Sequence, residues 1–214
     1  MITGYKGVIF DFNGTLFWDT ALHNQAWDIF LETHGIHLSD EEKDKRMHGK
    51  MNHDILRSIL DKPLSNREME KMILEKEGIY QQICRKKALG LAPGVEKYLN
   101  FLKINNIPFT IATASGIENI DFYFDYLPLE QWFDRKLIVY NDGSFPGKPE
   151  PDIFLIAARR LALPIEDTII FEDSFSGIKA AEQARAGKIV IVNSSGNDYS
   201  AYPHQIINNF DIIT

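Results

Sequence analysis

Short apolar segments recur along the chain and are separated by stretches whose apolar residues have helical spacing. Strands that are buried on both faces of a parallel sheet form continuous apolar runs, with little alternation of apolar and polar residues. Strand–helix–strand alternation therefore predicts an α/β fold with a doubly wound parallel sheet. The predicted strands, all rich in Ile, Val and Phe, are 6–12, 107–114, 136–140, 167–173 and 187–193.

Apolar residues at intervals of three or four predict helices between these strands. Residues 94–104 carry such a pattern, and residues 151–162 begin with Pro151, which suits the first turn of a helix. Residues 174–186 end at Gly187, a residue that commonly follows the last turn.

A long stretch after the first predicted strand contains no convincing strand. Residues 20–33 have apolar side chains at helical spacing, and Ser65 with Glu68 matches a capping box at the start of another helix. Two linkers would allow such an insert to hinge over the sheet as a lid. We therefore expect an α/β core domain formed by 1–18 and 90–214, and an inserted all-helical cap domain at 19–89.

Composition limits which partners and which cellular compartment are expected for the protein. The 214 residues include 23 basic and 30 acidic side chains, a formal net charge of −7, which argues against nucleic-acid binding. No apolar run approaches the ~20 residues of a membrane span. The one cysteine, Cys84, allows no internal disulfide and suits a reducing compartment. We expect a cytoplasmic monomer with no nucleic-acid or membrane partner.

Polar side chains stand where several predicted strands end. In an open parallel sheet, ligands bind outside the carboxyl ends of the strands. These positions therefore form a candidate site, although each residue alone is also typical of a turn or a helix cap. The residues are Asp11, Thr113, Ser115, Glu172 and Asp173, with Lys148 in a Gly- and Pro-rich loop.

This set of side chains favours phosphoryl transfer. An aspartate such as Asp11 can attack phosphorus and form an acyl phosphate. Asp11 and Asp173, with Glu172 close by, offer the hard oxygen ligands that Mg²⁺ prefers. Lys148 would pair with phosphate oxygens, and the Thr113 hydroxyl would donate a hydrogen bond to the transferring group.

Four motifs resemble those of the haloacid dehalogenase (HAD) superfamily: DFNGT, ATAS, GKPEPDIF and FEDSFSGIKAA. The helical insert after the first motif is similar to the superfamily's C1-type cap, and the last two motifs resemble the β-phosphoglucomutase-like branch. The resemblance covers essentially the whole chain. It implies a Rossmann-like core, Mg²⁺ as the cofactor and a small phosphorylated metabolite as the substrate.

The resemblance also implies residue roles. Asp11 matches the nucleophile and a metal ligand, and Glu172 and Asp173 match the metal-site acids. Asn13 occupies the position of the general acid/base, whose main-chain carbonyl also binds the metal. Thr113 and Lys148 match catalytic groups that bind the phosphate. The implied substrate-binding residues are Thr113, Ala114, Ser115, Lys148, His23, Trp27, Gly49 and Asn52.

Asn13 departs from the family pattern, which has aspartate there. An amide donates and accepts hydrogen bonds but cannot shuttle a proton. General acid/base catalysis contributes about 10²–10⁴ in rate, or roughly 3–5.5 kcal/mol. The sequence therefore predicts a phosphatase of a small phosphate monoester that is slowed by Asn13.

Two alternatives stay open. The first is a β-phosphoglucomutase-like phosphotransferase, for which the family's cap arginine and a lysine after the second motif are missing. Asn52 stands at the position of the arginine, and Gly116 and Ile117 stand where the lysine is expected. The second alternative is a catalytically silent member that binds a phosphorylated ligand or a protein. Asn13 favours that alternative, whereas the otherwise intact charged residues oppose it.

Overall fold

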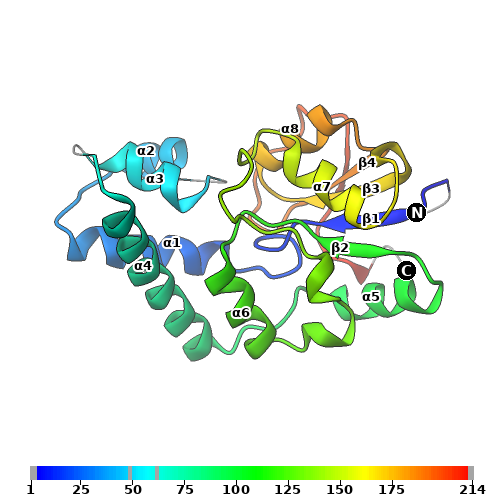
Figure 1. Cartoon of the computed structure of the whole chain (residues 1–214), viewed down its shortest axis with the longest axis horizontal. Coiled ribbons are helices and arrows are strands. Elements are labelled where there is room, and N and C mark those ends of the chain that lie inside the picture. Colours follow the sequence, from blue (N-terminus) through cyan, green and yellow to red (C-terminus); the bar gives the residue numbers. More distant parts are fainter. Residues whose placement is uncertain (1–3, 48–49, 61–62, 212–214) are drawn as a thin grey trace.

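The computed structural model of the chain describes residues 4–47, 50–60 and 63–211. Its strands form one sheet in the order β2-β1-β3-β4-β5, and every neighbouring pair is parallel (Figure 1). The order changes direction at β1, as in doubly wound α/β folds. The predicted parallel sheet is thus confirmed. The strands are β1 (Gly7–Phe10), β2 (Phe109–Ile111), β3 (Thr168–Glu172), β4 (Lys188–Val192) and β5 (Gln205–Ile207).

Helices cover both faces of this sheet. Val8 and Phe10 of β1 belong to a core cluster with residues of α5 and α6, whereas Ile9 packs in a second cluster with α7 and α8. Both sides of the strand are therefore apolar, which explains the continuous apolar runs. These helices are α5 (Val95–Ile104), α6 (Ile117–Tyr126), α7 (Asp152–Arg160) and α8 (Phe175–Ala184), with short 3-10 helices η1 (Leu129–Gln131), η2 (Arg135–Leu137) and η3 (Ile165–Asp167).

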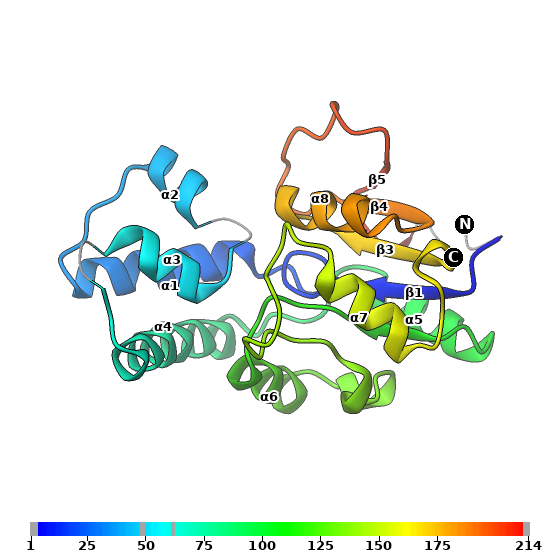
Figure 2. The same ribbon diagram turned by 45° about the horizontal axis from the view of Figure 1, so that its top comes forward.

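Four further helices, here called the helical group, lie together to one side of the sheet (Figures 1 and 2). β1 points toward them, so they stand beyond the carboxyl ends of the strands. Trp27, Phe30 and Leu56 are among the buried residues that hold the group together. The described part of 20–87 contains no strand. The group consists of α1 (Thr20–Thr33), α2 (Asp40–Arg46), α3 (Asn52–Ile59) and α4 (Asn66–Lys87).

The predicted strand at 136–140 is wrong in its first half. The Asp134 side chain accepts a hydrogen bond from the Lys136 main chain (2.9 Å) and starts the turn of η2. Only Val139 bridges to the sheet, next to Ala112. β5 lies outside the predicted strands, because its three residues, two of them exposed, are too few to form a pattern.

The predicted helices are confirmed, with small shifts at their ends. α1 spans the predicted range, and α4 begins with the predicted capping box of Ser65 and Glu68. α8 ends at Ala184 because Arg185 adopts the left-handed conformation (φ 61°), so Gly187 lies beyond the end. None of the helices in the described ranges is long and apolar enough to cross a bilayer.

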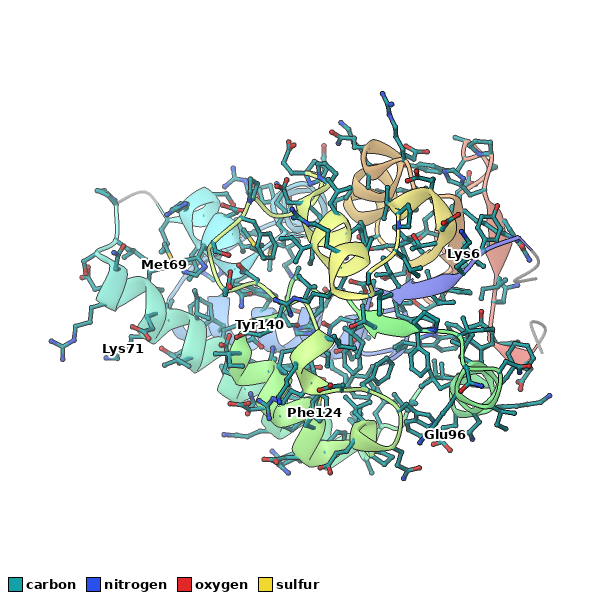
Figure 3. All side chains as sticks on the ribbon, turned by 45° about the vertical axis from the view of Figure 1, so that its right-hand side comes forward. Lys6, Met69, Lys71, Glu96, Phe124 and Tyr140 are labelled. Carbon is teal, nitrogen blue, oxygen red and sulfur yellow. The ribbon has the colours of Figure 1, made fainter. Side chains whose placement is uncertain are left out.

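The amino ends of the strands lie away from the helical group. Lys6 marks this end of β1 in Figure 3, and its Nζ pairs with Asp167 Oδ2 (2.8 Å), just before β3. The two neighbouring strands are therefore joined at their start by an exposed ion pair. Their carboxyl ends, which face the helical group, are free to carry a site.

Two buried charged residues of α4 join the helical group to α6. Lys76 and Glu77 are 1% and 2% exposed, and Lys76 Nζ lies 3.0 Å from Glu77 Oε1. Glu77 also accepts hydrogen bonds from Asn119 Nδ2 of α6 (2.8 Å) and Asn52 Nδ2 of α3 (2.6 Å). Burial disfavours the Glu77 carboxylate, but Lys76, His23 and the two amides outweigh it and lower its pKa to about 2.

Replacing Glu77 by Gln should destabilise the protein strongly, because Lys76 would stay buried without its carboxylate. We expect a loss of about 3–5 kcal/mol in the free energy of unfolding at pH 7, measured with urea. A lowered pKa contributes stability that is present above the ordinary value of 4.5 and is lost as the pH falls through about 2. The deficit of the variant should therefore shrink between these two pH values.

Glu75→Gln is the control on the same helix, because Glu75 forms a partly exposed ion pair with His34 (3.1 Å). This change should shift the free energy of unfolding by less than about 1 kcal/mol. A Glu77→Gln deficit that is constant between pH 4.5 and 2 would contradict the lowered pKa of Glu77.

Candidate active site

Lys148 bridges two carboxylates at the carboxyl end of the sheet. Its Nζ lies 2.6 Å from Asp11 Oδ1 and 2.5 Å from Glu172 Oε1, and all three side chains are buried. Asp11 directly follows β1, Glu172 ends the neighbouring β3, and Lys148 comes from the loop before α7. The structure thus brings together three residues that are far apart in the chain and that the sequence assigned to one site.

A cluster of three acids surrounds this bridge. Asp11, Glu172 and Asp173 each offer a carboxylate oxygen within 4.8 Å of the others. Both Glu172 oxygens already accept hydrogen bonds, from Lys148 and from the main-chain nitrogen of Ser174 (2.5 Å). Hard oxygen donors fit Mg²⁺. Asp11 and Asp173 are therefore the side chains that suit a metal best, while Glu172 orients Lys148.

The site carries more negative than positive charge. Burial raises the pKa of Asp11 to about 7; Lys148 opposes this shift, and Glu172 and Asp19 add to it. Burial also raises the pKa of Asp173 well above its usual range, as do the Glu172 and Asp11 carboxylates. Although burial disfavours the Lys148 ammonium, Asp11 and Glu172 outweigh burial and raise its pKa. A divalent cation would neutralise the surplus charge.

Two glycines allow the acids to sit where they do. Gly14 has φ of 77°, and a Cβ there would lie 2.1 Å from Asp173 Oδ2. A Cβ on Gly177, in the first turn of α8, would lie 1.7 Å from Glu172 Oε1. The glycines of the DFNGT and EDSFSG motifs therefore make room for the carboxylates.

Asn13 is held by polar groups on every side of its amide. Its Nδ2 lies 2.7 Å from Asp19 Oδ2 and 2.6 Å from the Tyr123 hydroxyl, so both amide hydrogens have acceptors. Its Oδ1 accepts hydrogen bonds from Ser115 Oγ (2.8 Å) and Thr113 Oγ1 (3.3 Å). The predicted residues Asn13, Thr113 and Ser115 thus lie together, and the direction of the amide is fixed.

The predicted residues of the helical group lie in the polar network around α4. The His23 ring stacks on Tyr80, with ring centroids 3.8 Å apart. Trp27 is buried beneath the Lys76 ammonium, which lies 5.1 Å from its ring. The Asn52 amide donates to a buried carboxylate of α4 (2.6 Å) and so is already engaged.

Two further predicted substrate-binding residues stay predictions. Gly49 lies outside the described residues. Ala114 is half-buried in the turn between β2 and α6, beside the hydroxyl residues that contact the Asn13 amide. Its methyl group offers no polar contact, so any role would come from its main chain.

Sequence reasoning missed four residues of this network. Asp19 is the first residue of the expected cap domain, and its only local signal is its place four residues before His23 at the start of a helix. Tyr80 and Tyr123 fit the apolar sides of their helices, and their hydroxyl groups meet only in the fold (3.3 Å). Lys76 belongs to a charged surface pattern in the sequence and is buried by tertiary packing alone.

Comparisons with known proteins identify a family and similar enzymes. A profile of the haloacid dehalogenase-like hydrolases matches residues 5–185. A phosphorylated carbohydrates phosphatase of Thermotoga maritima is 30% identical over 200 residues, which cover 92% of this chain and 89% of that protein. The β-phosphoglucomutase of Bacillus subtilis is 31% identical over 185 residues, covering 84% and 80% of the two chains.

A solved structure is similar to the chain in its overall fold. The HAD hydrolase, family IA, variant 3, of Entamoeba histolytica is 36% identical and has a TM-score of 0.87, covering 98% of this chain and 95% of the other. The predicted Rossmann-like fold is confirmed, and the chain is an enzyme of the phosphatase or phosphotransferase type. The protein belongs to the haloacid dehalogenase-like hydrolase family.

Proposed function

We propose that the protein is a Mg²⁺-dependent phosphatase of a small phosphate monoester, such as a sugar phosphate, acting through a phospho-Asp11 intermediate. The observation that carries this proposal is the Lys148 bridge to Asp11 beside the Asp173 carboxylate. A nucleophile, a cation and a second acid then converge where an α/β sheet binds ligands. The Thermotoga maritima relative, named for phosphorylated carbohydrates, supports the substrate class.

Asp11, Asp173 and the main-chain carbonyl of Asn13 would hold Mg²⁺. When bound, the ion supplies positive charge that offsets the phosphate dianion as the anionic carboxylate approaches it. Glu172 is a further candidate ligand, but its hydrogen bonds give it the role of holding Lys148 in place.

Each side chain of the site would have its own role in the phosphoryl transfer. The Asp11 carboxylate attacks phosphorus, the bond from phosphorus to the leaving oxygen breaks, and that oxygen takes a proton from solvent. Lys148 binds the oxygens of the transferring group, and the Thr113 and Ser115 hydroxyls bind them by turning their hydrogens away from Asn13 Oδ1. Water then attacks the acyl phosphate, gives up a proton to solvent, and releases inorganic phosphate and free Asp11.

Asn13 limits both chemical steps. Its amide hydrogens are taken by Asp19 and Tyr123, and an amide neither protonates a leaving group nor activates water. The missing acid/base contribution is about 10²–10⁴ in rate. We infer a slow phosphatase with a long-lived phospho-Asp11, and a preference for substrates with good leaving groups.

We infer that residues 19–89 act as a cap over a core formed by 1–18 and 90–214. Met51, just before α3, touches the loop that carries the bridging lysine: a Cβ on Gly147 would lie 2.8 Å from Met51 Cε. This contact places the start of α3 beside the loop that carries Lys148, which supports a cap that selects substrates. The substrate-binding residues proposed on this basis are His23, Trp27, Gly49 and Asn52 from the cap, and Thr113, Ala114, Ser115 and Lys148 from the core.

A phosphotransferase of the β-phosphoglucomutase kind is the main alternative, and the Bacillus subtilis relative supports it. Such an enzyme must hold a second phosphate. Asn52 offers no charge for that task, because its amide donates to the buried Glu77 carboxylate (2.6 Å). A silent binding protein is disfavoured, because a purely structural site does not require the assembled Asp11–Lys148 pair.

Asp11→Asn keeps the shape of the nucleophile and removes its reactivity. We expect the release of phosphate from p-nitrophenyl phosphate and from a panel of sugar phosphates to fall at least about 100-fold. Removal of Mg²⁺ with EDTA should have the same effect, and added Mg²⁺ should reverse it. Asp198→Asn, at an exposed loop position, is the control and should behave as the wild type. An Asp11→Asn variant with wild-type rates would exclude phospho-Asp11.

An assay with glucose phosphate distinguishes a phosphatase from a phosphotransferase. We expect slow release of inorganic phosphate and no isomerisation, with or without a bisphosphate primer, measured by coupled assay. A reactive phosphodonor such as acetyl phosphate should also leave a phosphorylated protein that is visible by intact mass spectrometry. Isomerisation that depends on the primer would favour the phosphotransferase, and the absence of both phosphorylation and turnover would favour a silent protein.

Gly177→Ala tests the position of Glu172. Alanine is the better helix former by about 1 kcal/mol, but its Cβ would overlap the carboxylate that holds Lys148. We expect kcat/KM for p-nitrophenyl phosphate to fall at least about tenfold. Gly78→Ala, within α4 and with open space around its Cβ, is the matched control and should keep its activity with a slightly higher Tm. Unchanged kinetics in Gly177→Ala would show that Glu172 need not be held there.

A further inference from the structure

Glu118 is a half-buried carboxylate at the edge of the candidate active site. It is the second residue of α6 and lies three positions after Ser115, a proposed phosphate-binding residue. A Cβ on Gly116 would lie 2.5 and 2.6 Å from the two carboxylate oxygens of Glu118. The Glu118 side chain therefore folds back over the turn that leads from Ser115 into α6, in space that the glycine leaves open.

The helical group holds this turn in place. The Gln81 amide of α4 donates hydrogen bonds to the main-chain oxygen of Glu118 (3.3 Å) and to Asn119 Oδ1 (3.1 Å). The Asn119 amide in turn donates to the Glu77 carboxylate (2.8 Å). Glu118 is therefore fixed at the junction between the helical group and the core.

The carboxylate of Glu118 is left without a partner at this junction. No other residue in the described part of the chain donates a hydrogen bond to it or forms an ion pair with it. Burial, the largest effect, raises the pKa of Glu118, and Glu77 raises it further, whereas its own main-chain N–H, His53 and Lys76 lower it. The last two residues and Glu77 belong to the helical group, so the carboxylate lies close to that group as well as to the core.

The nearby buried charges are already paired with each other. Lys76 Nζ contacts Glu77 Oε1 (3.0 Å) and His23 Nδ1 (2.9 Å). A half-buried carboxylate without donors keeps a desolvation cost, which a ligand removes if it donates hydrogen bonds. Hydroxyl groups of a ligand supply such donors, and a second anion does not.

The end of a helix does not by itself explain the position of Glu118. An acid in the first turn is favourable beside the free amides of a helix, and Glu96 has the same second position in α5, also after a capping glycine. Glu96 is exposed, whereas Glu118 is half-buried. Of these two acids, Glu118 alone is covered by another part of the molecule.

We propose that Glu118 determines specificity: its carboxylate accepts hydrogen bonds from hydroxyl groups of the substrate and repels a second anion. This inference rests on the proposed function, in which the cap contacts the part of the substrate that is not transferred. The substrate class is then a phosphate monoester of an uncharged, hydroxyl-rich molecule, such as a sugar or a sugar alcohol. Bisphosphates and phosphorylated acids are disfavoured.

Two matched compounds test the charge preference. Sorbitol 6-phosphate and 6-phosphogluconate share the phosphate and the carbon skeleton, but the second carries a carboxylate at its far end. We expect the wild type to release phosphate from sorbitol 6-phosphate with a kcat/KM at least about tenfold higher. Glu118→Gln keeps the size and removes the charge, so this ratio should fall at least about tenfold. An unchanged ratio in Glu118→Gln would overturn the proposal.

Three further variants separate the charge of Glu118 from its place on a helix. Glu118→Asp keeps a carboxylate and should retain more of the ratio than Glu118→Gln, whereas Glu118→Lys should favour 6-phosphogluconate. Glu96→Gln removes an acid from the same position of α5 and should keep the wild-type ratio. A ratio that falls as far in Glu96→Gln as in Glu118→Gln would contradict a specific role for Glu118.

A binding measurement separates this proposal from the proposed function. In Asp11→Asn, which lacks the nucleophile, isothermal titration calorimetry with Mg²⁺ gives Kd for both compounds. We expect sorbitol 6-phosphate to bind at least about tenfold more tightly, and added Glu118→Gln should remove this preference. Equal binding of the two compounds, or no binding of sorbitol 6-phosphate at millimolar concentration, would overturn the proposed substrate class.

The two proposals fail in different ways. If binding shows the preference but no protein with Asp11 releases phosphate, the proposed function fails while the role of Glu118 stands. If sugar phosphates are hydrolysed with the same ratio in the wild type and in Glu118→Gln, the role of Glu118 fails while the proposed function stands.

Discussion

The Lys148 bridge between Asp11 and Glu172 is the constraint on which the rest of the site depends. The register of the sheet pairs Phe10 with Phe171, so Asp11, which follows β1, and Glu172, the last residue of β3, lie side by side at the carboxyl edge of the sheet. Unpaired buried carboxylates cost several kcal/mol each in desolvation. A single ammonium held between them at 2.6 and 2.5 Å makes this arrangement possible.

The pairing of buried polar groups extends from the core into the helical group. Asn13 links the Ser115 hydroxyl to Asp19, and polar contacts continue from Asn13 through His23 and Lys76 to Glu77. A buried polar network is favourable only when its members are satisfied, so it permits few arrangements of its parts. The position of the helical group over the site is therefore specified by hydrogen bonds as well as by apolar packing.

The sequence predicts most strands of the sheet and half of the residues of the site, for one physical reason. Parallel strands buried on both faces form apolar runs, and their carboxyl ends lie at one edge, so Asp11, Glu172 and Asp173 can be grouped without coordinates. The segment 136–140 misleads because Ile138 and Val139 are buried, yet the hydrogen bond to Asp134 turns the chain just before them.

What the sequence could not supply are contacts whose partners lie on different elements. Tyr80 and Tyr123 fit helical apolar patterns, and nothing local shows that both hydroxyls meet at the Asn13 amide or its acceptor. Lys76 lies within a run of charged residues on α4, and its burial follows only from the packing of Trp27 and Tyr80 around it. Long-range partners of this kind leave no periodic signal.

Asn13 shows why contacts between different elements matter when a sequence motif is interpreted. By its position in the motif, Asn13 replaces one of the two acids that the family ordinarily has there. In the fold, the Asn13 amide donates a hydrogen bond of 2.7 Å to the buried Asp19 carboxylate just before α1. The amide therefore ties the turn after β1 to the start of the helical group, a link that the position of Asn13 in the motif does not reveal.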